Sequence, residues 1–187
     1  MKLLLKNARI AFPCLFTPRA FEMDGDRAFS AHLIIEKGGE TAAQVLNACR
    51  SAAEEKWGSA KGNALFEALR KQDRICLHDG DQKSDYDGFG GMLYVSARSP
   101  SERRPLVIDA DKTHLREEEG RPYAGCYVNA LLELYGQDNK YGKRINASLK
   151  GIQFVRDGDA FGGAAPAKED DFDDVSDIGA TELASLL

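Results

Sequence analysis

The sequence predicts a mainly β domain with one helical insertion, followed by an acidic tail. About seven short segments of alternating apolar residues, separated by Gly- and Pro-containing turns, indicate strands, and such a series is typical of a barrel or a sandwich. Residues 41–71 instead repeat their apolar side chains at the helical period. Residues 164–187 are acidic and poor in apolar side chains, so we expect them to be disordered.

The expected elements follow one another with little intervening chain. The first strand ends at Pro13, because proline removes a ladder donor, and the second ends at Gly38-Gly39. We expect Gly136 to Gly142 to form a hairpin loop, and residues 82–91 to form a polar loop. The expected strands are residues 3–12, 28–36, 74–78, 92–98, 106–109, 126–135 and 144–156.

Charge divides the chain into two parts. The net charge is −5, but residues 164–187 hold seven acidic residues and one basic residue, a charge of −6. The first 163 residues therefore carry +1, and the overall sign says little about the surface of the domain. We expect a domain at residues 1–163 and a tail at residues 164–187.

Targeting and metal signals are weak in this sequence. The apolar stretch at Leu3-Leu4-Leu5 is too short for a signal peptide, and no run approaches the ~18 apolar residues of a membrane span, so we expect a cytoplasmic protein. The four cysteines are scattered and lack the spacing of a zinc site. We expect no metal and no cofactor.

The late strands carry the functional signal. With side chains alternating between faces, one face of each strand is apolar and the other mixes tyrosine with Arg, Lys, Asn and Ser. We expect a bulge at Gly151 to bring Ile152 and Phe154 onto the polar face. Aromatic rings that stack on bases and basic groups that neutralise phosphates are the mixture that binds single-stranded nucleic acid, although a solvated sheet face also carries such residues.

We therefore predict a sequence-independent single-stranded DNA site on this face. The stacking candidates are Tyr94, Tyr127, Tyr135, Tyr141 and Phe154. The phosphate-binding candidates are Arg98, Arg103, Arg104, Lys140, Lys143, Arg144 and Lys150.

The tail has its own predicted role. Its acidic residues can imitate the DNA polyanion, compete for the basic face and be offered to partner proteins once DNA is bound; an inert solubilising tail is the alternative. The partner-binding candidates are Asp170, Asp171, Phe172, Asp173, Asp174, Leu186 and Leu187.

Two other classes of function stay open. Clustered carboxylates can hold Mg²⁺ for phosphodiester cleavage, which would make the chain a nuclease. No second carboxylate cluster supports this one, and a module that binds only proteins is the other alternative. The acidic cluster consists of His78, Asp79, Asp81, Asp85 and Asp87.

Several stretches resemble a family of bacteriophage single-stranded DNA-binding proteins. The first comprises Lys6 to Pro13 with Leu15-Phe16-Thr17-Pro18, followed by Gly91 to Arg98 and Arg104 to Asp109. The most distinctive are Tyr123-Ala124-Gly125-Cys126-Tyr127-Val128-Asn129-Ala130 and Gly151-Ile152-Gln153-Phe154-Val155-Arg156-Asp157-Gly158. The likeness covers nearly all of residues 1–163.

This resemblance implies an OB-fold, a small Greek-key barrel whose sheet face binds oligonucleotides, and a non-enzymatic role in phage DNA replication or recombination in the host bacterial cytoplasm. The acidic tail is similar in kind to those of bacterial and T7-type single-stranded DNA-binding proteins, which recruit replication proteins. Those tails often end in an aromatic residue, whereas this chain ends in Ser185-Leu186-Leu187. The helical insertion lies before the third barrel strand.

Overall fold

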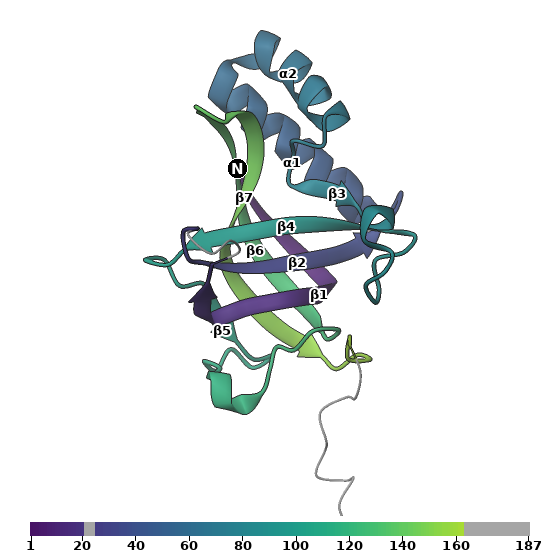
Figure 1. The fold of residues 1–187 in the computed structure, drawn as a ribbon, viewed down its shortest axis with the longest axis vertical. Coiled ribbons are helices and arrows are strands. Elements are labelled where there is room, and N and C mark those ends of the chain that lie inside the picture. The colour runs from purple at the N-terminus through teal and green to yellow at the C-terminus, as the bar shows by residue number, and fades with distance from the viewer. Residues whose placement is uncertain (21–24, 163–187) are drawn as a thin grey trace, which may run out of the picture.

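The computed structural model describes residues 1–20 and 25–162 and contains a closed five-stranded barrel (Figure 1). Neighbouring strands pair antiparallel in the order β4-β2-β1-β6-β7, and a parallel pairing between β4 and β7 closes the barrel. This is the predicted Greek-key barrel of OB type. The five strands are β1 (Lys2–Arg19), β2 (Ala28–Glu36), β4 (Met92–Pro100), β6 (Tyr127–Asn139) and β7 (Gly142–Arg156).

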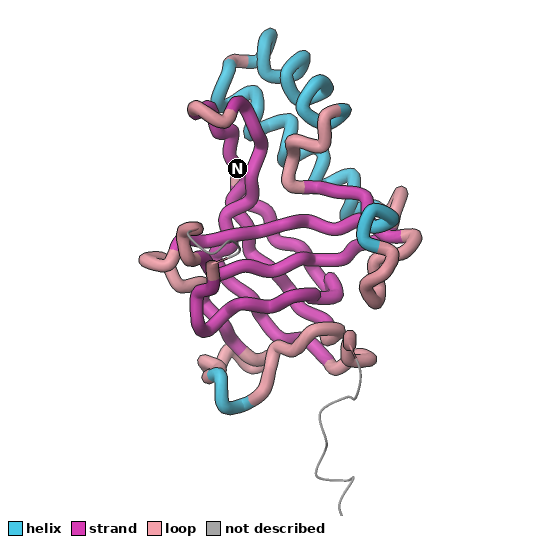
Figure 2. The backbone as a smooth tube through the Cα atoms, in the orientation of Figure 1, coloured by secondary structure: helices cyan, strands magenta, loops and turns pink. Residues whose placement is uncertain are grey.

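Two short strands extend the sheet beyond the barrel. β3 (Leu77–Asp79) pairs antiparallel with residues 93–95 of β4. β5 (Leu106–Ile108) pairs parallel with residues 151–153 of β7. The backbone drawn in Figure 2 shows strands across the middle of the molecule, with loops gathered at their ends. Short 3₁₀ turns follow β3 at Gly80–Lys83 and occur at Glu117–Glu119.

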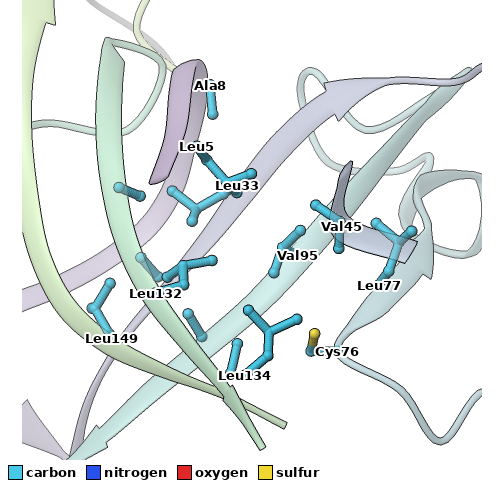
Figure 3. Close-up of a cluster of buried hydrophobic side chains, with 14 of the residues drawn as sticks. Leu5, Ala8, Leu33, Val45, Cys76, Leu77, Val95, Leu132, Leu134 and Leu149 are labelled. Carbon is cyan, nitrogen blue, oxygen red and sulfur yellow. The ribbon is translucent and has the colours of Figure 1, made fainter. Parts of the chain in front are cut away.

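The interior of the barrel is filled by the predicted apolar faces. Alternate residues of β6 from Val128 to Leu134 are fully buried, as the period of two requires. Figure 3 shows Leu5, Leu33, Val95, Leu132 and Leu149 pointing into one cluster from five different strands. Burial of such side chains stabilises the fold by about 1.5–3 kcal/mol each.

The helical insertion consists of α1 (Glu40–Trp57) and α2 (Ser59–Lys71) and lies beside the β6–β7 hairpin at one end of the molecule (Figure 1). Val45 and Cys49 of α1 belong to the same buried cluster as the barrel interior. Gly58 ends the first helix with a φ of 82°, a conformation that favours glycine. At Gly62 a Cβ would lie 2.6 Å from the Glu54 Cα, so only glycine lets the two helices approach this closely. None of the helices in residues 1–20 and 25–162 is long and apolar enough to span a membrane.

The first strand differs from the prediction because it continues through Pro13 to Arg19. Its register with β2 shifts between Ala11 and Cys14, so Pro13 sits in an irregular stretch where the ladder does not need its missing N–H. Phe12 has a positive φ of 48°, and its side chain is 46% exposed. The Phe12 ring therefore points outward at this irregular part of the strand.

The β6–β7 hairpin is longer than predicted. Residues 136–139 and 142–144 pair as strand, from Gly136 opposite Ile145 to Asn139 opposite Gly142, which leaves Lys140 and Tyr141 as the turn. The sequence had indicated a loop here because Gly, Asp and Asn are common in turns. The polar side chains instead lie on a solvated extension of the ladder.

A bulge does occur next to Gly151, but its effect is the reverse of the prediction. The register between β6 and β7 shifts between the Leu132–Leu149 and Leu131–Gly151 pairs. The extra residue turns Ile152 and Phe154 into the core, where they are 1% and 5% exposed. Phe154 is therefore a core residue, and its assignment to the DNA-binding face was wrong.

Candidate nucleic-acid interface

The outer surface of β2 and β4 is the part of an OB barrel that binds oligonucleotides. The two strands pair over their whole length, so each outward residue of one has a defined neighbour on the other. Ser30 faces Arg98, His32 faces Ser96 and Ile34 faces Tyr94. Side chains of four kinds, apolar, aromatic, hydroxyl and basic, therefore succeed one another along this surface.

A basic groove occupies one end of the surface. It has a volume of about 410 Å³ and lies between β4, the arms of the β6–β7 hairpin and the residues just before β2. Three predicted residues meet here, because Arg98, Tyr135 and Arg144 all line it. Tyr135 is 45% exposed and pairs in register with Asn146. We use "basic groove" for Arg27, Ser96, Arg98, Tyr135, Arg144 and Asn146.

An aromatic cluster occupies the other end of the surface. The loop between β3 and β4 folds back over the sheet, so that the Phe89 ring lies 5.2 Å from the Tyr94 ring and 5.8 Å from the Phe12 ring. The Tyr94 ring in turn lies 4.9 Å from the His32 ring. We use "aromatic cluster" for Phe12, His32, Tyr86, Phe89 and Tyr94.

The rings of the aromatic cluster differ in exposure: two face the solvent and two are buried. Phe12 and Tyr86 are 46% and 54% exposed, whereas Phe89 and Tyr94 are 1% and 6% exposed. Tyr94 lies on the predicted face, but the loop covers it, so in this conformation it supports the cluster and offers no free ring face. The exposed rings border an apolar cleft of about 290 Å³ that is closed on another side by Phe161.

Burial sets the protonation of the polar groups in the cluster. Desolvation, with the nearby charges of Lys83 and His78, lowers the pKa of His32 to about 4, so the imidazole is neutral at physiological pH. Burial also lowers the pKa of Lys83 and raises that of Tyr94. The Lys83 ammonium lies 5.0 Å from the centre of the Tyr94 ring, within cation–π range. The cluster thus combines ring faces with one positive charge.

Sequence reasoning missed Phe12, Tyr86 and His32 as site residues. Phe12 points outward because of a positive φ that the sequence pattern does not reveal. Tyr86 and Phe89 are two aromatic residues in a polar, Gly-rich loop, and that contrast was the available signal. His32 is a polar residue at an outward position of a strand whose other face is wholly apolar, which is a second available signal.

The aromatic cluster and the basic groove adjoin. The His78 ring stacks on Tyr94 with centroids 5.1 Å apart, and its Nε2 lies 3.1 Å from the Ser96 Oγ, which lines the groove. His32 of the aromatic cluster also pairs with Ser96 of the basic groove in the ladder between β2 and β4, so the cluster and the groove are adjacent.

Tyr127 lies on a different part of the barrel wall. The Arg156 and Arg9 guanidinium groups lie 3.4 Å and 5.6 Å from the centre of its ring. A second concavity of about 400 Å³ is lined by these three residues, by Lys6 and by the start of α1. Arg156 thus covers the Tyr127 ring more closely than Arg9 does, which leaves less of the ring for stacking on a base.

The other predicted residues are dispersed. Tyr141 is 70% exposed at the hairpin turn, with the Lys140 ammonium 5.0 Å from its ring. Lys143 and Lys150 form ion pairs with Asp138 at 3.2 Å and with Glu133 at 2.6 Å.

Two predicted arginines lie elsewhere, in the turn between β4 and β5. Arg103 and Arg104 are both exposed there, and the Arg104 guanidinium lies 5.3 Å from the Phe16 ring. The predicted tail residues lie outside the described part of the chain.

The acidic residues after β3 form structural contacts. Lys37 pairs with Asp79 at 2.7 Å and also with Asp81, which lowers the pKa of both carboxyls. Asp87 accepts a hydrogen bond from the Gly162 N–H at 2.8 Å. Among residues 1–20 and 25–162, no three His, Cys, Asp or Glu side chains are grouped so as to hold a metal ion.

Comparison with known proteins identifies the family of this chain. The model of a family described as the single-stranded DNA-binding protein of Enterobacter phage Enc34 matches residues 1–182. Putative protein p50 of Acyrthosiphon pisum secondary endosymbiont phage 1 is 44% identical over 178 residues, which are 94% of this chain and 95% of that protein.

Solved structures show the same barrel. The Enc34 single-stranded DNA-binding protein in complex with single-stranded DNA superposes with a TM-score of 0.70 at 25% identity, covering 86% of this chain and 89% of that one. The T7 single-stranded DNA-binding protein gp2.5 superposes with a TM-score of 0.56 at 13% identity, covering 94% and 98%, a likeness in fold alone. The chain thus belongs to the Enc34 family of phage single-stranded DNA-binding proteins, a family of OB-fold binding proteins and not of enzymes.

Proposed function

We propose that this protein binds single-stranded DNA without strong sequence preference on the outer surface of β2 and β4, and does so during phage DNA replication or recombination in the host cytoplasm. The observation that carries the proposal is the adjacency of the aromatic cluster and the basic groove on that surface. The Enc34 relative, solved with single-stranded DNA, supports it.

Stacking supplies the part of the affinity that does not depend on base identity. Phe12 and Tyr86 at one end and Tyr135 at the other expose their rings to solvent. Each base that stacks on such a ring contributes about 1–3 kcal/mol, and every base offers a face to stack. Tyr141 is a further exposed ring, at the tip of the β6–β7 hairpin.

Phosphate neutralisation supplies the salt-dependent part. Arg98 of β4, Arg144 of β7 and Arg27, just before β2, line the basic groove, and among the described residues Asp26 lines it with them. For single-stranded DNA, each neutralised phosphate contributes about −0.7 to the slope of log K against log salt. A strand held by these three arginines gives a slope of about −2 from them alone.

The acidic tail competes with DNA for this surface and recruits partner proteins when it is displaced. Support comes from where the described chain ends. The Phe161 ring packs on the aromatic cluster, with the Arg9 guanidinium 4.4 Å from its centre, and the Gly162 N–H is held by Asp87. A tail that starts here, with a charge of −6 on residues 164–187, starts beside the DNA-binding surface.

The tail proposal is tested by comparing the full chain with a chain ending at Gly163. Fluorescence anisotropy with labelled single-stranded DNA is measured for both at 50 and 200 mM salt. Competition predicts that the shortened chain binds more tightly, and that the difference shrinks at high salt, where the charges are screened. Equal affinities at low salt would show that the tail does not compete.

A further inference from the structure

A chain of hydrogen bonds leads from the solvent to the basic groove. The Asp73 Oδ1 lies 2.8 Å from the His78 Nδ1, and the His78 Nε2 lies 3.1 Å from the Ser96 Oγ. The stack on Tyr94 keeps the imidazole between its two partners. His78 is 17% exposed and Asp73 is 47% exposed, so the carboxylate end is open to water while the imidazole is largely covered.

The chemistry of the partners fixes the direction of each bond. An ionised carboxylate only accepts hydrogen bonds, so the His78 Nδ1 carries a proton. In the neutral imidazole the Nε2 is then an acceptor, and the Ser96 hydroxyl donates its proton to it. Ser96 has no proton left for the groove in that state and presents only lone pairs, which repel a phosphate oxygen.

Protonation of His78 reverses the second bond. Both ring nitrogens are then donors, so the Nε2–H donates to the Ser96 Oγ, and the Ser96 O–H is released to donate to a group in the groove. A phosphate oxygen accepts such a bond, and the positive charge behind the serine strengthens it. The protonated form therefore fits an anion in the groove and the neutral form does not.

The Ser96 amide is engaged within the sheet, which matters for a different use of the same three residue types. Serine, histidine and aspartate in this order also occur in hydrolases, where the amide of the serine commonly helps to stabilise an oxyanion. Here the Ser96 N–H donates to the Cys76 carbonyl at 2.9 Å within the sheet. The arrangement orients the hydroxyl without providing that donor.

Titratable and charged groups face His78 from three neighbouring segments. Asp73, from the turn before β3, is the hydrogen-bond partner of the His78 Nδ1. His32 of β2, with its pKa lowered to about 4, stays neutral above pH 5 and does not compete for the proton. The Lys83 ammonium lies next to Tyr94 of β4, the ring on which His78 stacks, and a bound phosphate adds a negative charge to these surroundings.

We propose that His78 and Asp73 are positioning residues that switch Ser96 from acceptor to donor, so that binding of a DNA phosphate in the basic groove takes up a proton at His78. This inference rests on the proposed function, because it needs the phosphate to lie in that groove. It predicts that affinity for single-stranded DNA rises as the pH falls through the range in which histidine side chains titrate.

The test uses the full chain and labelled oligo-dT at constant ionic strength, at pH 8 and pH 6. If binding takes up one proton, the affinity for DNA can change by at most about tenfold per pH unit. We expect binding to be about fivefold tighter at pH 6 than at pH 8. H78Q and S96A should each bind equally at the two pH values within about twofold, since each breaks the link between the proton and the groove. H114Q, which removes an exposed histidine outside the groove, should keep the wild-type pH dependence.

Calorimetry separates this role from a merely structural one. Binding at pH 6.5 is measured in two buffers with different ionisation enthalpies, and the difference gives the number of protons taken up. The wild type and H114Q should take up a fraction of one proton, and H78Q should take up none. Thermal unfolding of each variant checks that it is folded.

The outcomes distinguish this inference from the function on which it rests. Equal pH dependence in H78Q and the wild type overturns the inference. So does a pH-independent wild type, provided that Arg144→Ala still weakens binding, and in that case the groove remains the DNA site. If Arg144→Ala and Tyr135→Ala leave binding unchanged, the groove is not the DNA site and the proposed function fails as well.

Discussion

The ring of Phe12 meets the ring of Tyr86 edge-on, with centroids 5.2 Å apart and planes at 87°. Phe12 comes from the irregular part of β1 and Tyr86 from the loop before β4, so the contact joins two segments far apart in the sequence. Both rings are about half exposed and line the cleft of about 290 Å³.

Replacing either exposed ring should weaken DNA binding. F12A and Y86A should each raise the Kd for oligo-dT about 5- to 150-fold, which corresponds to the ~1–3 kcal/mol of one stacked base. L106A, which removes an exposed apolar side chain on β5, is the matched control and should bind as the wild type does. Anisotropy at one salt concentration suffices, and wild-type affinity in both aromatic variants would remove the cluster from the DNA path.

Tyr135 and Tyr127 should behave differently. Y135A removes an exposed ring from the basic groove, so it should weaken DNA binding and leave the unfolding midpoint nearly unchanged. Y127A removes the ring that Arg9 and Arg156 pack against, so it should lower the unfolding midpoint and affect binding less. Urea unfolding and DNA titration of both variants check this, and the reverse pattern would place the DNA on the Tyr127 side of the barrel.

The arginines of the basic groove should account for part of the salt dependence. Arg98→Ala and Arg144→Ala should each make the slope of log K against log salt shallower by about 0.7, the value for one phosphate on a single strand. Lys150→Ala should change the slope less, because Lys150 does not line the basic groove. Anisotropy titrations at four salt concentrations give the slopes, and an unchanged slope in both arginine variants would exclude their contact with phosphates.

Lowering the pH should destabilise the protein through His32 before the carboxylates of the protein are protonated. The folded state holds the pKa of His32 at about 4, against an ordinary value of 6.5, so the unfolded chain binds the proton first as the pH falls. The stability due to neutral His32 is therefore full above pH 6.5 and is lost between pH 6.5 and 4. This amounts to about 2 kcal/mol between pH 7 and pH 5.

Urea unfolding at the two pH values measures this effect. His32→Gln removes the titrating group and keeps a polar side chain of similar size, so its stability should depend less on pH over this range. An equal loss in the variant and the wild type would mean that another group causes it.

Regular alternation is the reason the barrel could be predicted. The β6 face from Val128 to Leu134 is apolar at every second position, and a strand with one buried face has no other register that hides it. The helical insertion could also be predicted, because its apolar residues recur at the helical period. Family motifs then distinguished the OB barrel from other β folds.

The sequence did not reveal features of the site that depend on irregular backbone or on a loop packed against the sheet. A glycine at position 151 indicates a bulge, but not to which side the next residues turn, and this reversed the assignment of Phe154. The positive φ of Phe12 depends on tertiary context. Tyr94 is covered because Phe89 folds back onto it, a contact between loop and strand that no local pattern encodes.

Photocrosslinking tests the central claim, that DNA lies on the outer surface of β2 and β4, most directly. Single-stranded DNA substituted with 5-iodouracil, which crosslinks to aromatic side chains stacked on it, is irradiated with the full chain, and the modified residues are identified by mass spectrometry. DNA on this surface should give crosslinks at Phe12, Tyr86 and Tyr135. Crosslinks confined to Tyr123 and Tyr127, with none at those three residues, would contradict it and place the DNA on another part of the barrel.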